Sequence, residues 1–130
     1  MARYEEWIKR AKSSLELSKA TVNNVVYFED LCYLVQQAAE KAMKGLLIYY
    51  GIEPEFTHNI EILINELKKF IDIPKEIKEA VKLTKFAIFT RYPGEYDEIT
   101  KEEYEKSIKI AQDCLDWVEK IIERESKKTS

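Results

Sequence analysis

Apolar side chains recur at intervals of three and four residues through almost the whole chain, and this spacing constrains the fold more than any other feature. It puts them on one face of an α-helix, whereas a half-buried strand needs strict alternation. The pattern predicts an all-α fold, an antiparallel up-and-down bundle of four long helices plus one shorter helix. The expected helices span about residues 3–23, 28–50, 60–71, 74–88 and 100–122.

Several residues at the expected helix ends support this division. The second run has an apolar stripe wider than a surface helix needs, so it should be the central helix, and Gly51 suits the position that stops it. Thr57 or Asn59 is expected to cap the third helix. Thr100 and Glu103 have the spacing of a capping box, which predicts the start of the last helix.

Composition favours one folded domain. The chain has 130 residues, of which 45% are hydrophobic and 35% charged, with only 3 Gly and 3 Pro, and this balance excludes disorder. We expect a single helical domain over residues 1–125, followed by a frayed polar tail at 126–130. The abundance of Lys, Glu and Ile resembles the composition of thermophile proteins.

The sequence predicts a cytoplasmic protein with no membrane partner. Its first residues are charged throughout, unlike a signal peptide, and the longest apolar run, "GLLIYYGI", is too short to span a bilayer. Cys32 and Cys114 occupy apolar helical positions and are expected to be reduced core residues. No metal-ligand spacing or Gly-rich phosphate loop occurs, so neither a metal nor a cofactor is expected.

The stretch "FAIFTRYPGEYDEIT", residues 86–100, interrupts the helical pattern. Arg91 comes just before a Pro-Gly pair, so its guanidinium should emerge where the chain turns, where it can hold a phosphate bidentately. The alternative is structural: Arg91 caps helix carbonyls or pairs with Glu95 or Asp97. Because the net charge is −3, any contact with nucleic acid must be local.

A basic stripe leads toward this turn. Lys75, Lys78, Lys82 and Lys85 follow one another at three- and four-residue steps on the expected fourth helix. Such a stripe can track phosphates, although a charged helix face is more often simply solvated.

His58 is the only histidine, and it precedes the expected third helix. Imidazole is the side chain best suited to proton transfer near neutral pH, but a single histidine at a helix entry is most often a cap or a packed polar residue. Tyr92 and Tyr96 flank the Pro-Gly turn and are candidates for contact with a base, whereas the other tyrosines fit the core rim or a subunit contact better.

Three segments together resemble the HEPN (higher eukaryotes and prokaryotes nucleotide-binding) domain family. They are "LCYLVQQAAEKAMKGLLIYYG", "THNIEILINEL" and "TRYP". The resemblance implies a helical bundle that forms a homodimer and pairs with a minimal nucleotidyltransferase in toxin–antitoxin systems. It also implies that nucleotide or RNA is the ligand, since many members are metal-independent ribonucleases. Their site is an Arg followed, after four to six residues, by a His, and both subunits of the dimer contribute this motif.

The resemblance assigns roles around the turn. Arg91 matches the arginine of the family motif, but the positions allowed for histidine hold Tyr96, Asp97 and Glu98. His58 can substitute if it approaches Arg91 across the bundle or the dimer, and Tyr96 can hold a phosphate without proton transfer. Some family partners transfer a nucleotide to a tyrosine near the arginine, so the resemblance makes Tyr92 and Tyr96 candidate acceptors.

Glu40 and Lys44 belong to the family signature in the second helix. Helical spacing puts Gln37, Glu40 and Lys44 on one face, where Glu40 can orient Arg91 if that face meets the turn. The alternative is that these polar residues only face water or the other subunit.

These observations favour a nucleotide- or phosphate-binding interaction module, a toxin-like component that pairs with a nucleotidyltransferase, with Arg91 as the phosphate ligand. Tyr92, Tyr96, Lys85, Glu40 and Lys44 complete the expected binding set. The alternative is a metal-independent ribonuclease in which Arg91 and His58 are catalytic, and a purely structural dimerisation module is the third interpretation.

Overall fold

A computed structural model of the chain describes residues 3–19, 26–89 and 98–128. All regular elements in this part of the chain are helical, which confirms the predicted all-α class. The elements are α1 (Tyr4–Ser18), α2 (Phe28–Tyr49), α3 (Ile60–Leu67), α4 (Lys75–Lys78), the 3-10 helix η1 (Glu79–Lys85), α5 (Phe86–Phe89) and α6 (Lys101–Lys128).

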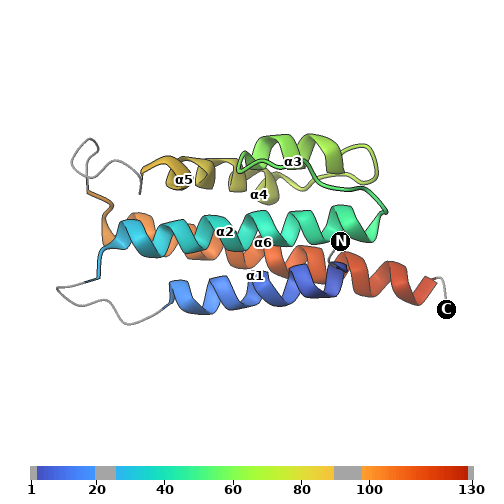
Figure 1. Ribbon diagram of the computed structural model, residues 1–130, viewed down its shortest axis with the longest axis horizontal. Helices are drawn as coiled ribbons and strands as arrows, with labels where there is room; N and C mark the ends of the chain where they lie inside the picture. The colour runs from blue at the N-terminus through green and yellow to red at the C-terminus, as the bar shows by residue number, and fades with distance from the viewer. Residues whose placement is uncertain (1–2, 20–25, 90–97, 129–130) are drawn as a thin grey trace.

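The helices form an elongated bundle with α2 at its centre (Figure 1). Helix α1 runs in the opposite direction to α2 and α6, and the α3 to α5 region covers the other side of α2. Helix α2 contacts α1, α3, η1, α5 and α6. Its wide apolar stripe therefore packs on several sides at once, as the sequence predicted for a central helix.

The predicted fourth long helix is divided into three consecutive pieces, α4, η1 and α5. The middle piece has 3-10 geometry, which is narrower than an α-helix and is usually short. Within η1, the Thr84 hydroxyl accepts a hydrogen bond from the backbone N–H of Ile60 at 3.1 Å. This hydrogen bond joins η1 to the start of α3, and the periodicity of the sequence could not predict it.

Other helix ends also differ from the prediction. Helix α3 ends at Leu67, short of residue 71, in a turn where the N–H of Phe70 donates to the Leu67 carbonyl. Helix α6 continues to Lys128, so residues 126–128 of the expected tail are helical. Pro74 precedes the first residue of α4 instead of lying in its first turn.

The cap predictions are largely confirmed. Asn59 caps α3 by accepting from the Glu61 N–H at 2.9 Å, and the Thr57 hydroxyl accepts from the Asn59 N–H at 3.0 Å. At the start of α6, the Thr100 hydroxyl accepts from the Glu103 N–H at 3.1 Å. These bonds satisfy N–H groups that the first helical turn leaves without intrahelical acceptors.

Gly51 ends α2 as predicted. Its φ of 82° lies in the left-handed region, and its N–H donates to the Ile48 carbonyl while the Ile52 N–H donates to the Leu47 carbonyl. This pair of hydrogen bonds is a Schellman motif, which satisfies the last carbonyls of a helix.

We expect Gly51→Ala to lower the free energy of unfolding by about 1 kcal/mol. A Cβ at this position meets no atom within 4 Å, so the cost comes from the left-handed backbone and not from a clash. Urea denaturation of both proteins measures the difference. Gly51→Asn is the control, because asparagine tolerates this conformation better, and an equal loss in both variants would contradict the explanation.

A single cluster of buried apolar side chains joins α1, α2, α3, η1 and α6. Cys32 and Cys114 are free thiols within it, as predicted, and burial raises the pKa of each to about 12. Such thiols remain protonated near neutral pH and are poor nucleophiles. None of the helices in the described part of the chain combines the length and hydropathy that a bilayer span needs.

Candidate functional site

The structure brings together three of the residues that the sequence selected. His58, Glu40 and Lys44 form one polar cluster at the junction of α2 with the loop that leads to α3. Arg91, Tyr92 and Tyr96 lie outside the described residues, so their predicted roles stay predictions.

Glu40 is the centre of this cluster and is only 2% exposed. Its Oε1 accepts from Lys44 Nζ at 2.8 Å, and its two oxygens lie 3.1 and 3.2 Å from His58 Nδ1. Gln36 and Gln37 each donate from Nε2 to Glu40 Oε2 at 3.2 Å. We call Gln36, Gln37, Glu40, Lys44 and His58 the Glu40 cluster. Because a buried carboxylate is costly unless it is paired and hydrogen-bonded, these contacts explain how the helix tolerates it.

Helix geometry supplies four of the five members. On α2, Glu40 lies three or four residues from each of Gln36, Gln37 and Lys44, and the predicted shared face of Gln37, Glu40 and Lys44 is present. Gln36 was not among the predicted site residues, although it is fully buried. Its signal was a polar residue at an otherwise apolar helical position.

The loop brings in His58, and two contacts hold it. Glu40 contacts the ring, while Gln36 Nε2 donates to the His58 carbonyl oxygen at 3.0 Å. The cap of α3 at Asn59 follows immediately. Both the backbone and the ring of His58 are therefore positioned by buried or capped groups.

The imidazole is oriented and accessible at the same time. The His58 side chain is 48% exposed, while the carboxylate that contacts Nδ1 is buried. A carboxylate at Nδ1 favours the tautomer with a proton there and directs Nε2 away from it. The remaining nitrogen can accept a proton from a ligand or, in the charged form, donate to a phosphate oxygen.

Lys44 is not placed as an exposed residue that binds phosphate would be. Its side chain is 10% exposed, it pairs with Glu40, and its Nζ lies 5.8 Å from the centre of the Trp7 ring on α1. Lys44 therefore balances the buried charge of Glu40 and connects the cluster to α1.

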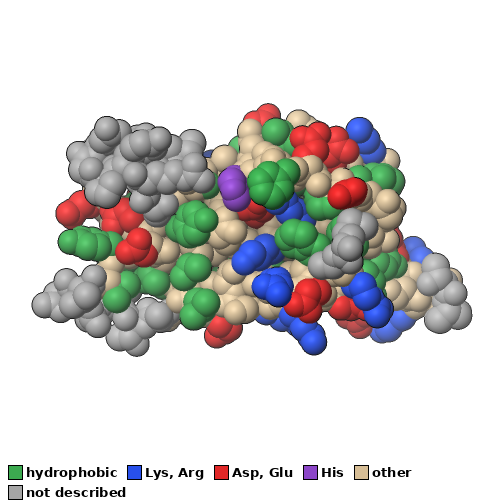
Figure 2. Space-filling view, in the orientation of Figure 1, with side chains coloured by type: hydrophobic (Ala, Val, Ile, Leu, Met, Phe, Trp, Pro, Cys, Tyr) green, Lys and Arg blue, Asp and Glu red, His purple; other side chains and the backbone are tan. Residues whose placement is uncertain are grey.

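Further cations lie where α2 meets α1. Lys41 Nζ donates to the Ser14 hydroxyl at 3.0 Å, and the pKa of Lys41 is lowered, first by burial and then by the charge of Arg10, while Glu40 acts in the opposite direction. Arg10 Nε donates to Glu6 at 3.2 Å. Figure 2 shows basic side chains below the histidine on this face of the bundle. Basic side chains thus lie close to the Glu40 cluster on this face, and several of them are paired with acidic residues.

Lys85 makes its contacts elsewhere. Its Nζ pairs with Glu103 of α6 at 2.8 Å and lies 5.3 Å from the centre of the Phe86 ring. Of the other stripe residues, Lys82 pairs with Glu79, and Lys75 and Lys78 are exposed. The stripe is therefore partly neutralised along its length.

One family is named both by a family model and by a similar solved structure. A family model described as the HEPN domain matches residues 4–121. The chain is 28% identical to MJ1304 of Methanocaldococcus jannaschii, a toxin candidate by name, with 89% of this chain and 86% of that protein covered.

Two crystal structures share the fold. TT1696 from Thermus thermophilus has a TM-score of 0.80 and 31% identity, covering 92% of this chain and 98% of that one. ST0689, described as an archaeal HEPN homologue, has a TM-score of 0.74 and 36% identity, covering 94% and 99%.

Proposed function

The chain belongs to the HEPN domain family, and from this membership we propose that it is a toxin-like component that binds nucleotide or RNA phosphate and pairs with a minimal nucleotidyltransferase. The similarity to a toxin candidate supports the first part. The observation that carries the binding role is the Glu40 cluster, in which a buried carboxylate holds a half-exposed imidazole on the same face as the basic side chains of α1 and α2. That arrangement suits an anionic ligand.

In this proposal Arg91 is the main phosphate ligand, because its position before the Pro-Gly turn matches the family arginine. Guanidinium groups bind phosphate bidentately, which gives both orientation and affinity. Tyr92 and Tyr96 are proposed to contact the base or accept a transferred nucleotide. The protein is proposed to act as a homodimer, so that the turns of two subunits share one cleft.

A ribonuclease is the second candidate, and the contact between Glu40 and His58 specifically favours it. The family motif lacks its histidine after Arg91, but His58 is oriented by a carboxylate and remains accessible. Such an imidazole can serve as general base or acid in phosphodiester cleavage, while Arg91 positions the phosphate. Carboxylate–imidazole pairs of this kind occur where proton transfer must be directional.

RNA incubation and nucleotide binding separate these functions. We expect Arg91→Ala to weaken nucleotide binding by roughly 10-fold or more, since a hydrogen bond to a charged group is lost. Binding can be followed by calorimetry and RNA cleavage by gel electrophoresis, with His58→Ala assayed in parallel. Lys120→Gln, an exposed change on α6, controls for the loss of one positive charge.

The outcomes point to different proteins. If the protein binds nucleotide but does not cleave RNA, and Arg91→Ala abolishes the binding, the binding module is supported. If the protein cleaves RNA, and both Arg91→Ala and His58→Ala abolish cleavage, it is the ribonuclease. If neither RNA nor nucleotide responds to Arg91→Ala, the chain is a structural dimerisation module. The proposed partner is supported if a neighbouring reading frame encodes a nucleotidyltransferase and that nucleotidyltransferase co-purifies with this chain.

A further inference from the structure

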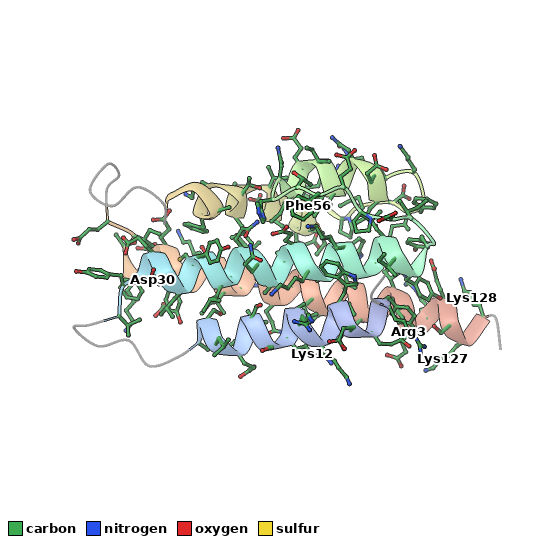
Figure 3. All side chains as sticks on the ribbon, in the orientation of Figure 1. Arg3, Lys12, Asp30, Phe56, Lys127 and Lys128 are labelled. Carbon is green, nitrogen blue, oxygen red and sulfur yellow. The ribbon has the colours of Figure 1, made fainter. Side chains whose placement is uncertain are left out.

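Phe56 is the most exposed large hydrophobic side chain in the described part of the molecule. Its relative exposure is 104%, so no described residue shields the ring. Phe70 offers a comparison, because it is 43% exposed and stacks against Tyr50 with ring centres 5.0 Å apart. In Figure 3 Phe56 lies on the viewer's side of the bundle, between α2 and α3.

The loop keeps this ring outside because its backbone is fixed on both sides of it. The Schellman motif at Gly51 sets where the loop leaves α2. After Phe56, the Thr57 N–H donates to the Glu55 carbonyl at 2.9 Å, and Gln36 holds the carbonyl of His58 at 3.0 Å. A backbone held in this way presents the aromatic ring instead of letting it fold onto the bundle.

A histidine and several basic side chains lie on the same face of the bundle as Phe56 (Figures 2 and 3). His58 follows two residues later with its ring positioned by Glu40, and Figure 2 shows a hydrophobic side chain directly beside the histidine. Lys41 and Arg10 place positive charge on the adjoining surface between α2 and α1. Arg10 pairs with Glu6, whereas Lys41 Nζ bonds to the uncharged Ser14 hydroxyl and so brings a positive charge that an anion can balance.

We propose that Phe56, Lys41 and Arg10 extend the Glu40 cluster at His58 into a binding site, in which a nucleobase stacks on Phe56 and its phosphate is held by His58 and Lys41. We call it the loop site. It rests on the proposed function for its class of ligand, but it uses none of the residues 90–97. Its ligand is a nucleoside phosphate, either free or within single-stranded RNA.

Known recognition chemistry matches this combination. Single-stranded RNA exposes unstacked bases that pack on aromatic side chains, and this stacking tolerates any base because each has a π-face. Phosphates bind nearby cations and release counterions, which makes affinity depend on salt. An exposed aromatic ring, an oriented imidazole and an adjoining basic surface supply both components.

Fluorescence anisotropy with the full chain and a labelled, unstructured single-stranded RNA tests the loop site. We expect Phe56→Ala to weaken binding roughly 5-fold or more, whereas Phe56→Trp should retain it because indole also stacks. Lys41→Gln should weaken binding and reduce the magnitude of the salt slope by about 0.7. Phe70→Ala and Lys120→Gln, which change the same residue types elsewhere, should leave affinity unchanged.

AMP as a competitor distinguishes the two sources of the ligand. If AMP displaces the RNA and its own binding falls in the Phe56→Ala variant, a free nucleotide is sufficient. If AMP does not compete, the strand itself is recognised. Either result supports the loop site when Phe56→Ala also weakens RNA binding.

Other results would overturn it. Unchanged RNA binding in Phe56→Ala and Lys41→Gln, together with loss in Arg91→Ala, would remove the loop site but keep the proposed function. If the Phe56→Ala protein forms a smaller oligomer than the unmodified protein but binds RNA with the same affinity, Phe56 is a subunit contact. If the unmodified protein binds neither RNA nor AMP, the loop site and the proposed function both fail.

Discussion

Glu40→Ala is expected to lower the free energy of unfolding by about 3–5 kcal/mol, because it leaves the Lys44 ammonium buried without its counter-charge. Only 10% of the Lys44 side chain is exposed, so water cannot replace the carboxylate. The same change removes the acceptor that Gln36, Gln37 and His58 share. Urea denaturation followed by circular dichroism measures the loss.

A double variant tests whether the unpaired charge is the cause. Replacing Glu40 with Leu and Lys44 with Met removes both charges while keeping similar volume, so it should recover a large part of the stability lost in Glu40→Ala. Recovery should be incomplete, because Gln36 and Gln37 each still lack one of the two acceptors of their side-chain N–H groups. If the double variant is no more stable than Glu40→Ala, burial of Lys44 is not the main cost.

Gly45→Val is expected to lower the free energy of unfolding by about 1–3 kcal/mol through overpacking. Even a Cβ at this position would lie 2.9 Å from Ile8 Cδ1 and 3.1 Å from Trp7 Cβ. The end of the Ile8 side chain can move, but Trp7 Cβ is attached to the α1 backbone, so α1 must shift. Thermal unfolding measures the loss, and tryptophan fluorescence should change with it.

Two further variants separate the clash from helix propensity. Gly45→Ala should cost less than Gly45→Val, because alanine gains about 1 kcal/mol of helix propensity over glycine and adds only one carbon. Lys120→Val puts the same β-branched side chain at an exposed position of α6, where we expect little change. A loss as large in Lys120→Val as in Gly45→Val would refute the packing explanation.

The predictions for Glu40 and Gly45 concern neighbouring parts of the same chain, where α1 packs on α2. Gly45 allows α1 to approach α2 closely, and that approach brings the Trp7 ring within 5.8 Å of Lys44 Nζ. Lys44 in turn pairs with the carboxylate that orients His58. The position of the imidazole therefore depends on helix packing as well as on the loop.

The sequence predicted most of the fold because the relevant signals are local. The apolar spacing identified every helical run and the central position of the second one, which α2 confirms by its contacts with α1, α3, η1, α5 and α6. Gly51 ends α2 through its left-handed backbone, and the side chains of Asn59 and Thr100 cap the starts of α3 and α6. The family, too, was identified from short segments, and the match over residues 4–121 confirms it.

The candidate site was predicted in part. Glu40, Lys44 and His58 were each selected, and helix geometry put the first two on one face, where the structure shows them in contact. The contact of Glu40 with His58 was not predicted, because it depends on the path of the loop between residues separated by 18 positions. Gln36 was not selected although its apolar helical position was a signal, and Phe56 was not selected because the exposure of a ring in a loop cannot be read from spacing.

The sequence alone determined which segments are helical, where several of them begin or end, and which family the chain resembles, because these depend on neighbours within one or two helical turns. The tertiary structure decided which side chain Glu40 holds, how closely α1 approaches at Gly45, and that the run after Pro74 is divided at η1. These features come from contacts between distant parts of the chain, where loop path, packing volume and burial together select one arrangement from many that the same periodicity allows.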